Sequence, residues 1–232
     1  MTTPEPVRLN KFLAQRLSIG RRAADELIEK GKVSVNGEKP ELGARVWPGD
    51  EVAVKGKVLN SAEAPQFLYV LFHKPTGYVS SRRQQGDTPT IYSLLSEKYH
   101  HLKPVGRLDK DTSGIMLLTN DGDLAYQLTH PKFKKVKKYE VSLDAPLQPL
   151  HRQMIGEMGV QLDDGPSRLQ LDRQREGDDT KWLVTMSEGR NRQIRRTFRA
   201  LGYEVTRLHR IQFGNYHIQN MKPGSIKEIS NP

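Results

Sequence analysis

The chain has 232 residues, with 37 Lys and Arg against 27 Asp and Glu, so its formal net charge is +10 at pH 7. Cysteine is absent, which excludes disulfide frameworks, thiolate nucleophiles and cysteine-based zinc sites. No stretch approaches the ~18 uninterrupted apolar residues of a membrane-spanning helix, and the N-terminus lacks the apolar core of a secretory signal. We therefore expect a cytoplasmic protein without a membrane partner, whose positive charge favours a polyanion.

The first 57 residues predict a small module of two helices and two short strands. Apolar residues recur at helical spacing from Leu9 to Leu17, and a second helix over 21–30 follows Ser18, which we expect to cap it. Short strands over 32–35 and 51–54 come next, and the first of them ends in an Asn-Gly turn signal. Residues 58–65 are predicted to form a linker.

Residues 66–232 are predicted to form a second, larger domain. Strands are expected over 68–73, 115–119, 139–143, 182–187 and 203–207, and helices over 91–98, 123–129, 147–158 and 192–201. This order lacks the even spacing of βαβ units and therefore favours a mainly antiparallel sheet. The predicted fold class is α+β, with a small N-terminal α/β module followed by a mainly antiparallel, mixed-sheet domain.

The predicted helix over 192–201 has one face of arginines. They lie at i, i+3, i+4 and i+7 and are Arg192, Arg195, Arg196 and Arg199. Like charges at these spacings repel by roughly 0.2–0.5 kcal/mol per pair in an isolated helix. A phosphate backbone would offset that repulsion, whereas the alternative is an exposed basic helix with partners on neighbouring loops. The basic face favours nucleic acid.

The N-terminal module carries a second basic surface. Its cations flank the two predicted helices and are Arg8, Lys11, Arg21, Arg22 and Lys32. A run of charge is usually a solvated face, so this feature alone decides nothing. Two separate basic surfaces in one basic chain favour RNA or DNA as the partner.

The segment that follows residue 105 is rich in short polar residues. Four of them match the first ligand positions of a calcium-binding EF-hand loop and are Asp109, Asp111, Ser113 and Gly114. The twelfth position would be Asn120 instead of a bidentate Glu, and residues 115–119 resemble a strand, so calcium is disfavoured. Two interpretations remain: the aspartates form a turn, or Asp109 is a catalytic carboxylate in an arginine-lined site.

Residues 106–122, which read GRLDKDTSGIMLLTNDG, closely resemble the signature of pseudouridine synthases of the RsuA type, a family that modifies bacterial ribosomal RNA. Residues 74–78, 138–139 and 188–196 resemble three further motifs of this family. Residues 7–54 resemble the small S-four-like RNA-binding domain, named after a ribosomal protein. The chain departs from the family pattern at His73 and Thr197, where Asn and Met are usual.

The resemblance implies an isomerase that needs no metal or other cofactor. The reaction cleaves the bond between ribose C1′ and uracil N1, rotates the base and rejoins it through C5. Asp109 is implied to be the essential carboxylate, either as a nucleophile or as the base that removes a ribose proton to give a glycal. Arg195 matches the cation expected to pair with Asp109 and to keep it ionised.

The resemblance also assigns supporting residues and partners. Tyr139 is implied to stack on the target uracil, and Arg107 to fill the gap left by a flipped uridine. The implied partner is ribosomal RNA or a ribosomal subunit precursor, bound by the N-terminal cations and by Arg192, Arg196 and Arg199. Nothing in the sequence demands more than a monomer. The alternative function is a non-catalytic RNA-binding or ribosome assembly factor.

Overall fold

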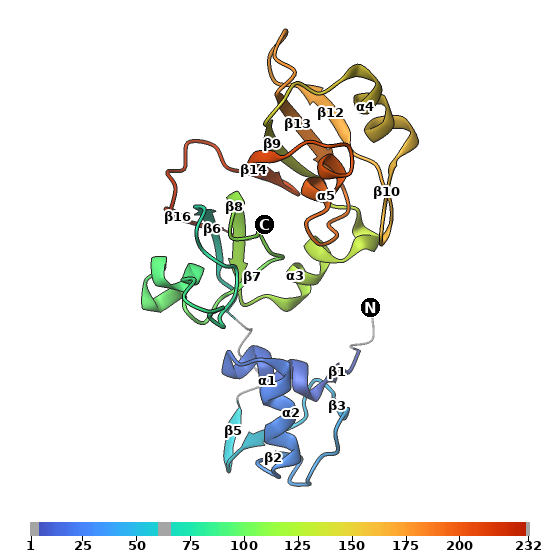
Figure 1. Cartoon of the computed structure of the whole chain (residues 1–232). Helices are drawn as coiled ribbons and strands as arrows, with labels where there is room; N and C mark the ends of the chain where they lie inside the picture. Colours follow the sequence, from blue (N-terminus) through green and yellow to red (C-terminus); the bar gives the residue numbers. More distant parts are fainter. Residues whose placement is uncertain (1–4, 60–65, 231–232) are drawn as a thin grey trace. The chain divides into compact units, whose positions relative to one another are not determined.

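The computed structural model describes residues 5–59 and 66–230 and divides the chain into two compact units, Met1–Leu68 and Tyr69–Pro232 (Figure 1). Within the described ranges, no helix is long and apolar enough to cross a membrane. The start of the predicted linker belongs to a strand, β5 (Lys57–Leu59), and the rest of that linker lies outside the described residues. We keep the domain limits 1–57 and 66–232 as a proposal.

The first unit packs two helices against short strands. Its other elements are β1 (Val7–Arg8), α1 (Leu9–Leu17), α2 (Arg21–Glu29), β2 (Val33–Val35), β3 (Arg45–Val46) and β4 (Val52–Val54). Strands β2, β4 and β5 form one antiparallel sheet, and β1 pairs with β3. The core is made of fully or nearly fully buried apolar side chains, including Leu9, Leu13, Ala24 and Ile28.

Two turn expectations in this unit have different outcomes. Asn36 and Gly37 both have positive φ, 53° and 84°, as the tight turn after β2 requires. The expected helix cap at Ser18 is wrong, because Ser18 ends α1 in the left-handed conformation and Gly20 precedes α2 instead. Ser18 therefore lies at the C-terminal end of α1 and not at the N-terminal end of α2.

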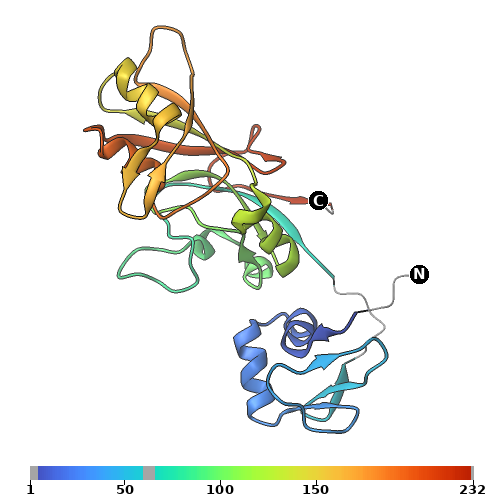
Figure 2. The same ribbon diagram turned by 90° about the vertical axis from the view of Figure 1, so that its right-hand side faces the viewer.

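A large mixed sheet organises the second unit (Figures 1 and 2). Its strands are β6 (Tyr69–Lys74), β7 (Lys103–Pro104), β8 (Ser113–Thr119), β9 (Lys137–Leu143), β12 (Gln170–Arg173), β13 (Lys181–Met186), β14 (Val205–Phe213), β15 (Tyr216–His217) and β16 (Ile226–Ile229). The main order is β12-β13-β9-β14-β8-β6-β16. Only the β14–β8 pair is parallel among the strand pairs of the described residues, so the mainly antiparallel α+β class is confirmed.

The remaining elements of this unit lie beside the sheet. They are η1 (Ile91–Leu94), η2 (Glu97–Tyr99), α3 (Gly122–Thr129), η3 (Pro131–Phe133), α4 (Pro149–Gln153), η4 (Met154–Met158), β10 (Val160–Leu162), β11 (Gly165–Ser167) and α5 (Gln193–Arg199). The predicted α-helix over 91–98 is wrong: two 3₁₀ turns replace it, with Leu95 and Ser96 extended between them. Burial of Leu95 and Tyr99 in this arrangement overrides the helical spacing.

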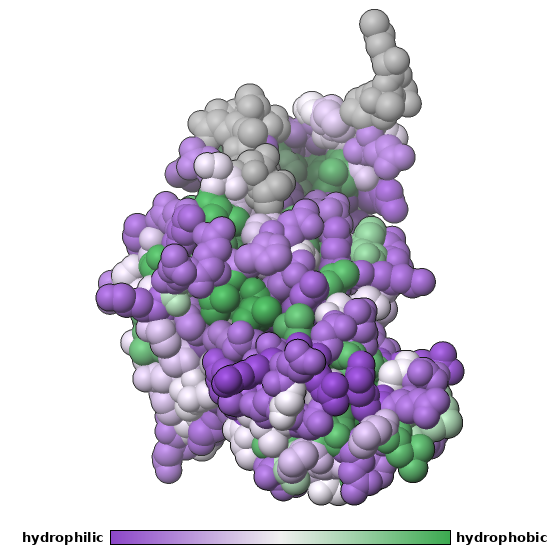
Figure 3. Space-filling model, turned by 90° about the horizontal axis from the view of Figure 1, so that it is seen from above, coloured by the Kyte–Doolittle hydropathy of each residue, from purple (hydrophilic) through white to green (hydrophobic). Residues whose placement is uncertain are grey.

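Most of the surface seen in Figure 3 is hydrophilic, and the hydrophobic residues on it are divided into separate patches. The apolar side chains of the second unit are instead buried along its strands. In β6 and β8 they include Val70, Phe72, Ile115 and Leu118, each with no exposed surface. The sheet is therefore a rigid support for the loops that join its strands.

A close approach between β8 and β14 fixes the centre of this sheet. The two strands run parallel where Arg210 pairs with Gly114. A Cβ on Gly114 would lie 2.2 Å from the Arg210 carbonyl oxygen and 2.4 Å from its backbone nitrogen, and φ at Gly114 is +124°. Only glycine satisfies both conditions. The loop over 106–112, which precedes β8, is thereby held against the middle of β14.

Candidate active site

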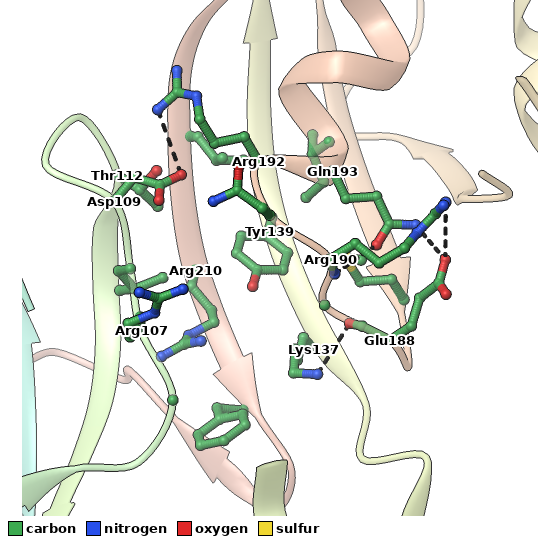
Figure 4. A pocket seen from close by; sticks show the side chains of 18 of the residues that line it. Arg107, Asp109, Thr112, Lys137, Tyr139, Glu188, Arg190, Arg192, Gln193 and Arg210 are labelled. Carbon is green, nitrogen blue, oxygen red and sulfur yellow. Dashed lines mark hydrogen bonds and ion pairs between the residues drawn. The ribbon is translucent and has the colours of Figure 1, made fainter. Parts of the chain in front are cut away.

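A pocket of about 410 Å³ opens beside this loop (Figure 4). Its lining comes from residues far apart in the sequence: the loop over 106–112, the first half of β9, the segment over 186–194 and the middle of β14. Of the residues that the sequence analysis singled out, Arg107, Asp109, Tyr139 and Arg192 line it. Arg195, Arg196 and Arg199 are not part of the lining.

A buried lysine holds the backbone of the Asp109 loop. The Lys74 ammonium donates hydrogen bonds to the carbonyl oxygens of Asp109 (2.9 Å) and Thr112 (2.8 Å), and also to that of Pro75. Its side chain has no exposed surface, and this burial lowers the pKa of Lys74 to about 8 despite the nearby carboxylates. Sequence reasoning placed Lys74 in a motif without assigning it this contact.

Asp109 faces a cation on the opposite side of the pocket mouth. Arg192 Nη1 lies 3.6 Å from Asp109 Oδ2, and the same guanidinium donates two hydrogen bonds, of 3.2 and 3.1 Å, to the carboxylate of Asp111. Arg192 has the left-handed conformation (φ 46°) immediately before α5, which is uncommon for residues other than glycine. One arginine therefore bridges both aspartates of the loop.

The expected pairing of Arg195 with Asp109 is wrong in this structure. Arg195 Nε lies 3.2 Å from Asp111 Oδ2, and its other nitrogens donate to the backbone carbonyls of Asp111 (2.9 Å) and Val205 (2.6 Å). The Arg195 side chain is 11% exposed. Since α5 begins at Gln193, Arg192 lies before the helix and its side chain contacts the carboxylates of the loop over 106–112. Arg195, inside the helix, links the backbone of that loop to the backbone of β14.

Asp111 is ionised more readily than an ordinary aspartate. Partial burial acts to raise its pKa, but the hydrogen bond from Arg192 and the charges of Arg195 and Arg192 outweigh burial and lower the pKa. Asp111 therefore stabilises the loop as an anion. The segment does turn here, since Thr112 N–H donates to the backbone carbonyl of Asp109 at 3.1 Å.

The arginines farther along α5 have partners within the chain. Arg196 pairs with Asp163 and Asp164, and Arg199 pairs with Glu204 at 2.9 Å. Carboxylates on neighbouring segments thus offset the like-charge repulsion along this face, as the alternative interpretation of the helix proposed. Contact of Arg196 and Arg199 with RNA remains a prediction.

The sheet aims a second set of side chains into the pocket. Tyr139 on β9 is 8% exposed and lies directly opposite Arg210 on β14 in the strand register. Leu208, two residues before Arg210, also lines the pocket. Figure 4 shows Arg107, Tyr139 and Arg210 around the same space. Arg210 was not singled out from the sequence, because a buried arginine on a strand has no distinctive pattern.

The two departures from the family pattern have structural roles. Thr197 donates to Ser167 Oγ at 2.7 Å, and Gln193 Nε2 donates to the same oxygen at 3.1 Å, in a buried network beneath α5. The His73 ring lies 5.2 Å from the ring of His209 and within 2.8 Å of a backbone carbonyl. In the described parts of the chain, no three His, Asp or Glu side chains group so as to hold a metal ion.

In the first unit, three of the expected RNA contacts lie together. Arg8, Lys11 and Arg21 line a hollow of about 360 Å³ to which Arg45, absent from the sequence expectations, also contributes. Arg22 and Lys32 are exposed outside this lining. The basic surface of the module is therefore concentrated where β1, β3 and α2 begin.

Two family models match the chain. One, described as RNA pseudouridylate synthase, matches residues 68–200, and the other, described as S4 domain, matches residues 7–52. The first match contains Asp109, Tyr139 and Arg192, and the second contains the four cations of the hollow, Arg8, Lys11, Arg21 and Arg45.

Curated relatives and a solved structure match nearly the whole chain. An uncharacterized RNA pseudouridine synthase of Aquifex aeolicus is 36% identical, over 97% of this chain and 93% of its own. The ribosomal large subunit pseudouridine synthase B of Bacillus subtilis is 35% identical (96% and 92%), as is the ribosomal small subunit pseudouridine synthase A of Pasteurella multocida (97% and 96%). A crystal structure of a pseudouridylate synthase aligns with a TM-score of 0.65 at 30% identity, covering 97% of this chain and 96% of that one.

Proposed function

This chain belongs to the RNA pseudouridylate synthase family, and we propose that it isomerises a specific uridine of ribosomal RNA to pseudouridine with Asp109 as the essential carboxylate. The observation that carries the proposal is the position of Asp109: its carboxylate lines the pocket and lies 3.6 Å from the Arg192 guanidinium. The two curated relatives named for ribosomal subunits support ribosomal RNA as the substrate.

Asp109 has the surroundings that either chemical route requires. A nucleophile or a general base must reach the ribose of the bound nucleotide, and Asp109 lines the pocket with the Arg192 guanidinium 3.6 Å away. The carboxylate must also be held in place, because a misplacement of about 1 Å can cost 10²-fold in rate. Lys74 below the loop and Arg195 beside it supply this support. Covalent attack and glycal formation both remain consistent with the site.

The base is flipped into the pocket, with its ring against Tyr139. The reacting bond is the link between base and ribose, which an enzyme cannot reach while the base is stacked in a helix. The buried Tyr139 ring offers a face for stacking, and Leu208 lines the same space. Arg107 is exposed and lines the same pocket, which supports its proposed role of occupying the gap in the RNA.

The first unit binds RNA through phosphate contacts. Its four cations, Arg8, Lys11, Arg21 and Arg45, outnumber the one acidic residue of the same hollow, Glu5, and phosphate contacts position a protein on RNA without reading sequence. Arg22 and Lys32 extend this surface. The first unit thus supplies affinity for structured ribosomal RNA or a subunit precursor, while the second carries the reaction.

The test is to map pseudouridines in ribosomal RNA from cells with and without the gene for this chain. We expect one site to be lost, restored by the wild-type chain and not by Asp109→Asn. If every site remains, the chain acts as a non-catalytic RNA-binding or assembly factor. If Asp109→Asn restores the site, Asp109 is not the essential carboxylate.

A further inference from the structure

Arg210 is a buried cation in the wall of the pocket. Its side chain is only 2% exposed, its Nε donates to the carbonyl of Ile115 at 2.9 Å, and its guanidinium lies 4.6 Å from the centre of the Phe213 ring. Its Nη2 is buried and has no hydrogen-bond partner among the described residues. The Arg210 guanidinium is therefore held at Nε, whereas Nη2 is a donor without an acceptor.

The setting of Arg210 differs from that of the arginines in the segment over 190–199. Each of those lies within 4 Å of a carboxylate oxygen, and they are Arg190, Arg192, Arg195, Arg196 and Arg199. Arg107 also lines the pocket, but it is exposed to water. No carboxylate in the described residues lies within that distance of Arg210, and its charge adds to burial in lowering the pKa of the nearby Lys137. A buried donor without an acceptor is costly, because it has lost its hydrogen bonds to water. A ligand that brings an acceptor would remove this cost.

The strand register places Arg210 beside the proposed uracil. Arg210 on β14 pairs directly with Tyr139 on β9, so the two side chains leave the sheet on the same face. Cβ atoms of such pairs lie about 4.5–5.5 Å apart. A base stacked on Tyr139 therefore presents one of its edges to the Arg210 guanidinium. Uracil has a carbonyl oxygen on either side of N3, and both are hydrogen-bond acceptors.

We propose that Arg210 binds a carbonyl oxygen of the flipped uracil and stabilises the negative charge that the base acquires during the reaction. When the bond between C1′ and N1 breaks, its electron pair stays on N1 and is delocalised onto the two carbonyl oxygens. Asp109 loses its own charge in the same step, either by bonding to C1′ or by taking the ribose proton. The charge thus moves from Asp109 to the base, where Arg210 receives it.

Burial favours the base over a phosphate as the ligand of Arg210. The phosphates of a flipped nucleotide remain with the RNA backbone, at the pocket mouth, where Arg192 has a side chain that is 41% exposed. Arg210, at 2% exposure, is reached only by a group that enters the pocket. The inference rests on the proposed function, since it needs a uridine that the chain converts.

The first experiment measures single-turnover conversion and RNA affinity for Arg210→Met and Arg210→Lys. Loss of one preorganised donor to a developing oxyanion typically costs about 10²–10³-fold in rate, so we expect at least a 10²-fold loss with RNA affinity nearly unchanged. Arg173→Met is the matched control, because Arg173 is on the edge strand β12 and pairs with Asp179 at 2.7 Å. This control should keep its rate within about twofold.

The second experiment replaces each uracil carbonyl oxygen of the target uridine by sulfur, a weaker acceptor, in separate RNAs. For the oxygen that Arg210 binds, the substitution should slow the wild-type chain about tenfold and add little in Arg210→Met. A purely structural role of Arg210 would leave the sulfur effect unchanged. Arg210→Lys, which keeps the charge, carries the same test if Arg210→Met does not fold.

Three results would overturn the role of Arg210. The first is that both sulfur effects persist in full in the Arg210 variants. The second is a loss that falls on RNA affinity alone. The third is coupling to a methylphosphonate at the target nucleotide, which would assign Arg210 to a phosphate. A wild-type chain that converts no uridine would overturn the proposed function itself, and this inference with it.

Discussion

Replacing Gly114 by alanine should separate the two strands on which the site depends. An added Cβ would lie 2.2 Å from the carbonyl oxygen and 2.8 Å from the carbonyl carbon of Arg210, whereas ordinary contacts begin near 3.4 Å. The clash is with backbone, so no side chain can rotate away, and β8 and β14 must move apart by more than about 1 Å. The φ of +124° adds strain for any L side chain.

These two costs give the expected magnitude. Overpacking typically costs about 1–3 kcal/mol and a strained backbone conformation another 1–3 kcal/mol, so we expect Gly114→Ala to lower the free energy of unfolding by about 2–6 kcal/mol. Urea unfolding of the full chain, followed by tryptophan fluorescence, measures this change. Single-turnover conversion should fall as well, because the Asp109 loop and Arg210 are positioned across this strand pair.

Two other glycines are matched controls. Gly177 has φ of +77° and open space around it, so Gly177→Ala measures the cost of positive φ alone. Gly122, in α3, has open space and no positive φ, so Gly122→Ala should change stability little or raise it slightly. If Gly114→Ala costs no more than Gly177→Ala, the close approach of β8 and β14 does not explain the glycine.

Three further predictions concern the arginine cluster. Arg195→Met should lower the free energy of unfolding by about 2–4 kcal/mol and slow conversion more than it weakens RNA binding. The reason is that it leaves the carbonyls of Asp111 and Val205 without this donor and frees the Asp109 loop from β14. Equal losses of rate and affinity would contradict this. Arg199→Ala should weaken RNA binding and reduce its salt dependence by about one charge. Glu204→Ala, which frees the Arg199 guanidinium from its ion pair, should strengthen RNA binding. If neither variant changes the affinity for RNA, Arg199 does not contact RNA. Arg192 and Arg195 outweigh burial and lower the pKa of Asp111 below its ordinary value of 3.8, so ionised Asp111 stabilises the fold above pH 3.8 and this stability is lost as the pH falls below it. The difference in unfolding free energy between wild type and Asp111→Asn should therefore shrink as the pH falls below 3.8. A difference that stays constant with pH would contradict this prediction.

Much of the sheet could be predicted because its strands are strongly apolar. The predicted strands over 68–73 and 115–119 became β6 and β8, with shifts of one or two residues at their ends, since continuous burial there leaves a clear pattern. Short strands without a turn signal beside them, such as β7 and β16, were missed because their pattern is too short to differ from a loop, whereas β2 and β4, which lie next to Asn-Gly and Pro-Gly turns, were predicted. The order of the strands in the sheet could not be predicted, because it depends on contacts between residues that are far apart in the sequence.

The site could be predicted only as far as local motifs reach. Asp109 and Tyr139, each of which lies within a recognisable motif, both line the pocket, and their roles in the reaction stay predictions. The partner of Asp109 was assigned to Arg195 instead of Arg192, because the start of α5 decides which arginine reaches the loop, and helix ends are the least predictable positions. Lys74 and Arg210 act through burial, which the sequence does not show.

Tritium release from RNA labelled at C5 of uridine tests the central claim most directly, because rejoining through C5 must release the hydrogen at that carbon. The wild-type chain should release tritium from its target site, and Asp109→Asn should be slower by at least about 10²-fold with RNA affinity unchanged. Asp172→Asn, on the edge strand β12, should behave as wild type. Release by Asp109→Asn within about tenfold of wild type, an energy difference of only 1.4 kcal/mol, would contradict the assignment of Asp109 as the essential carboxylate.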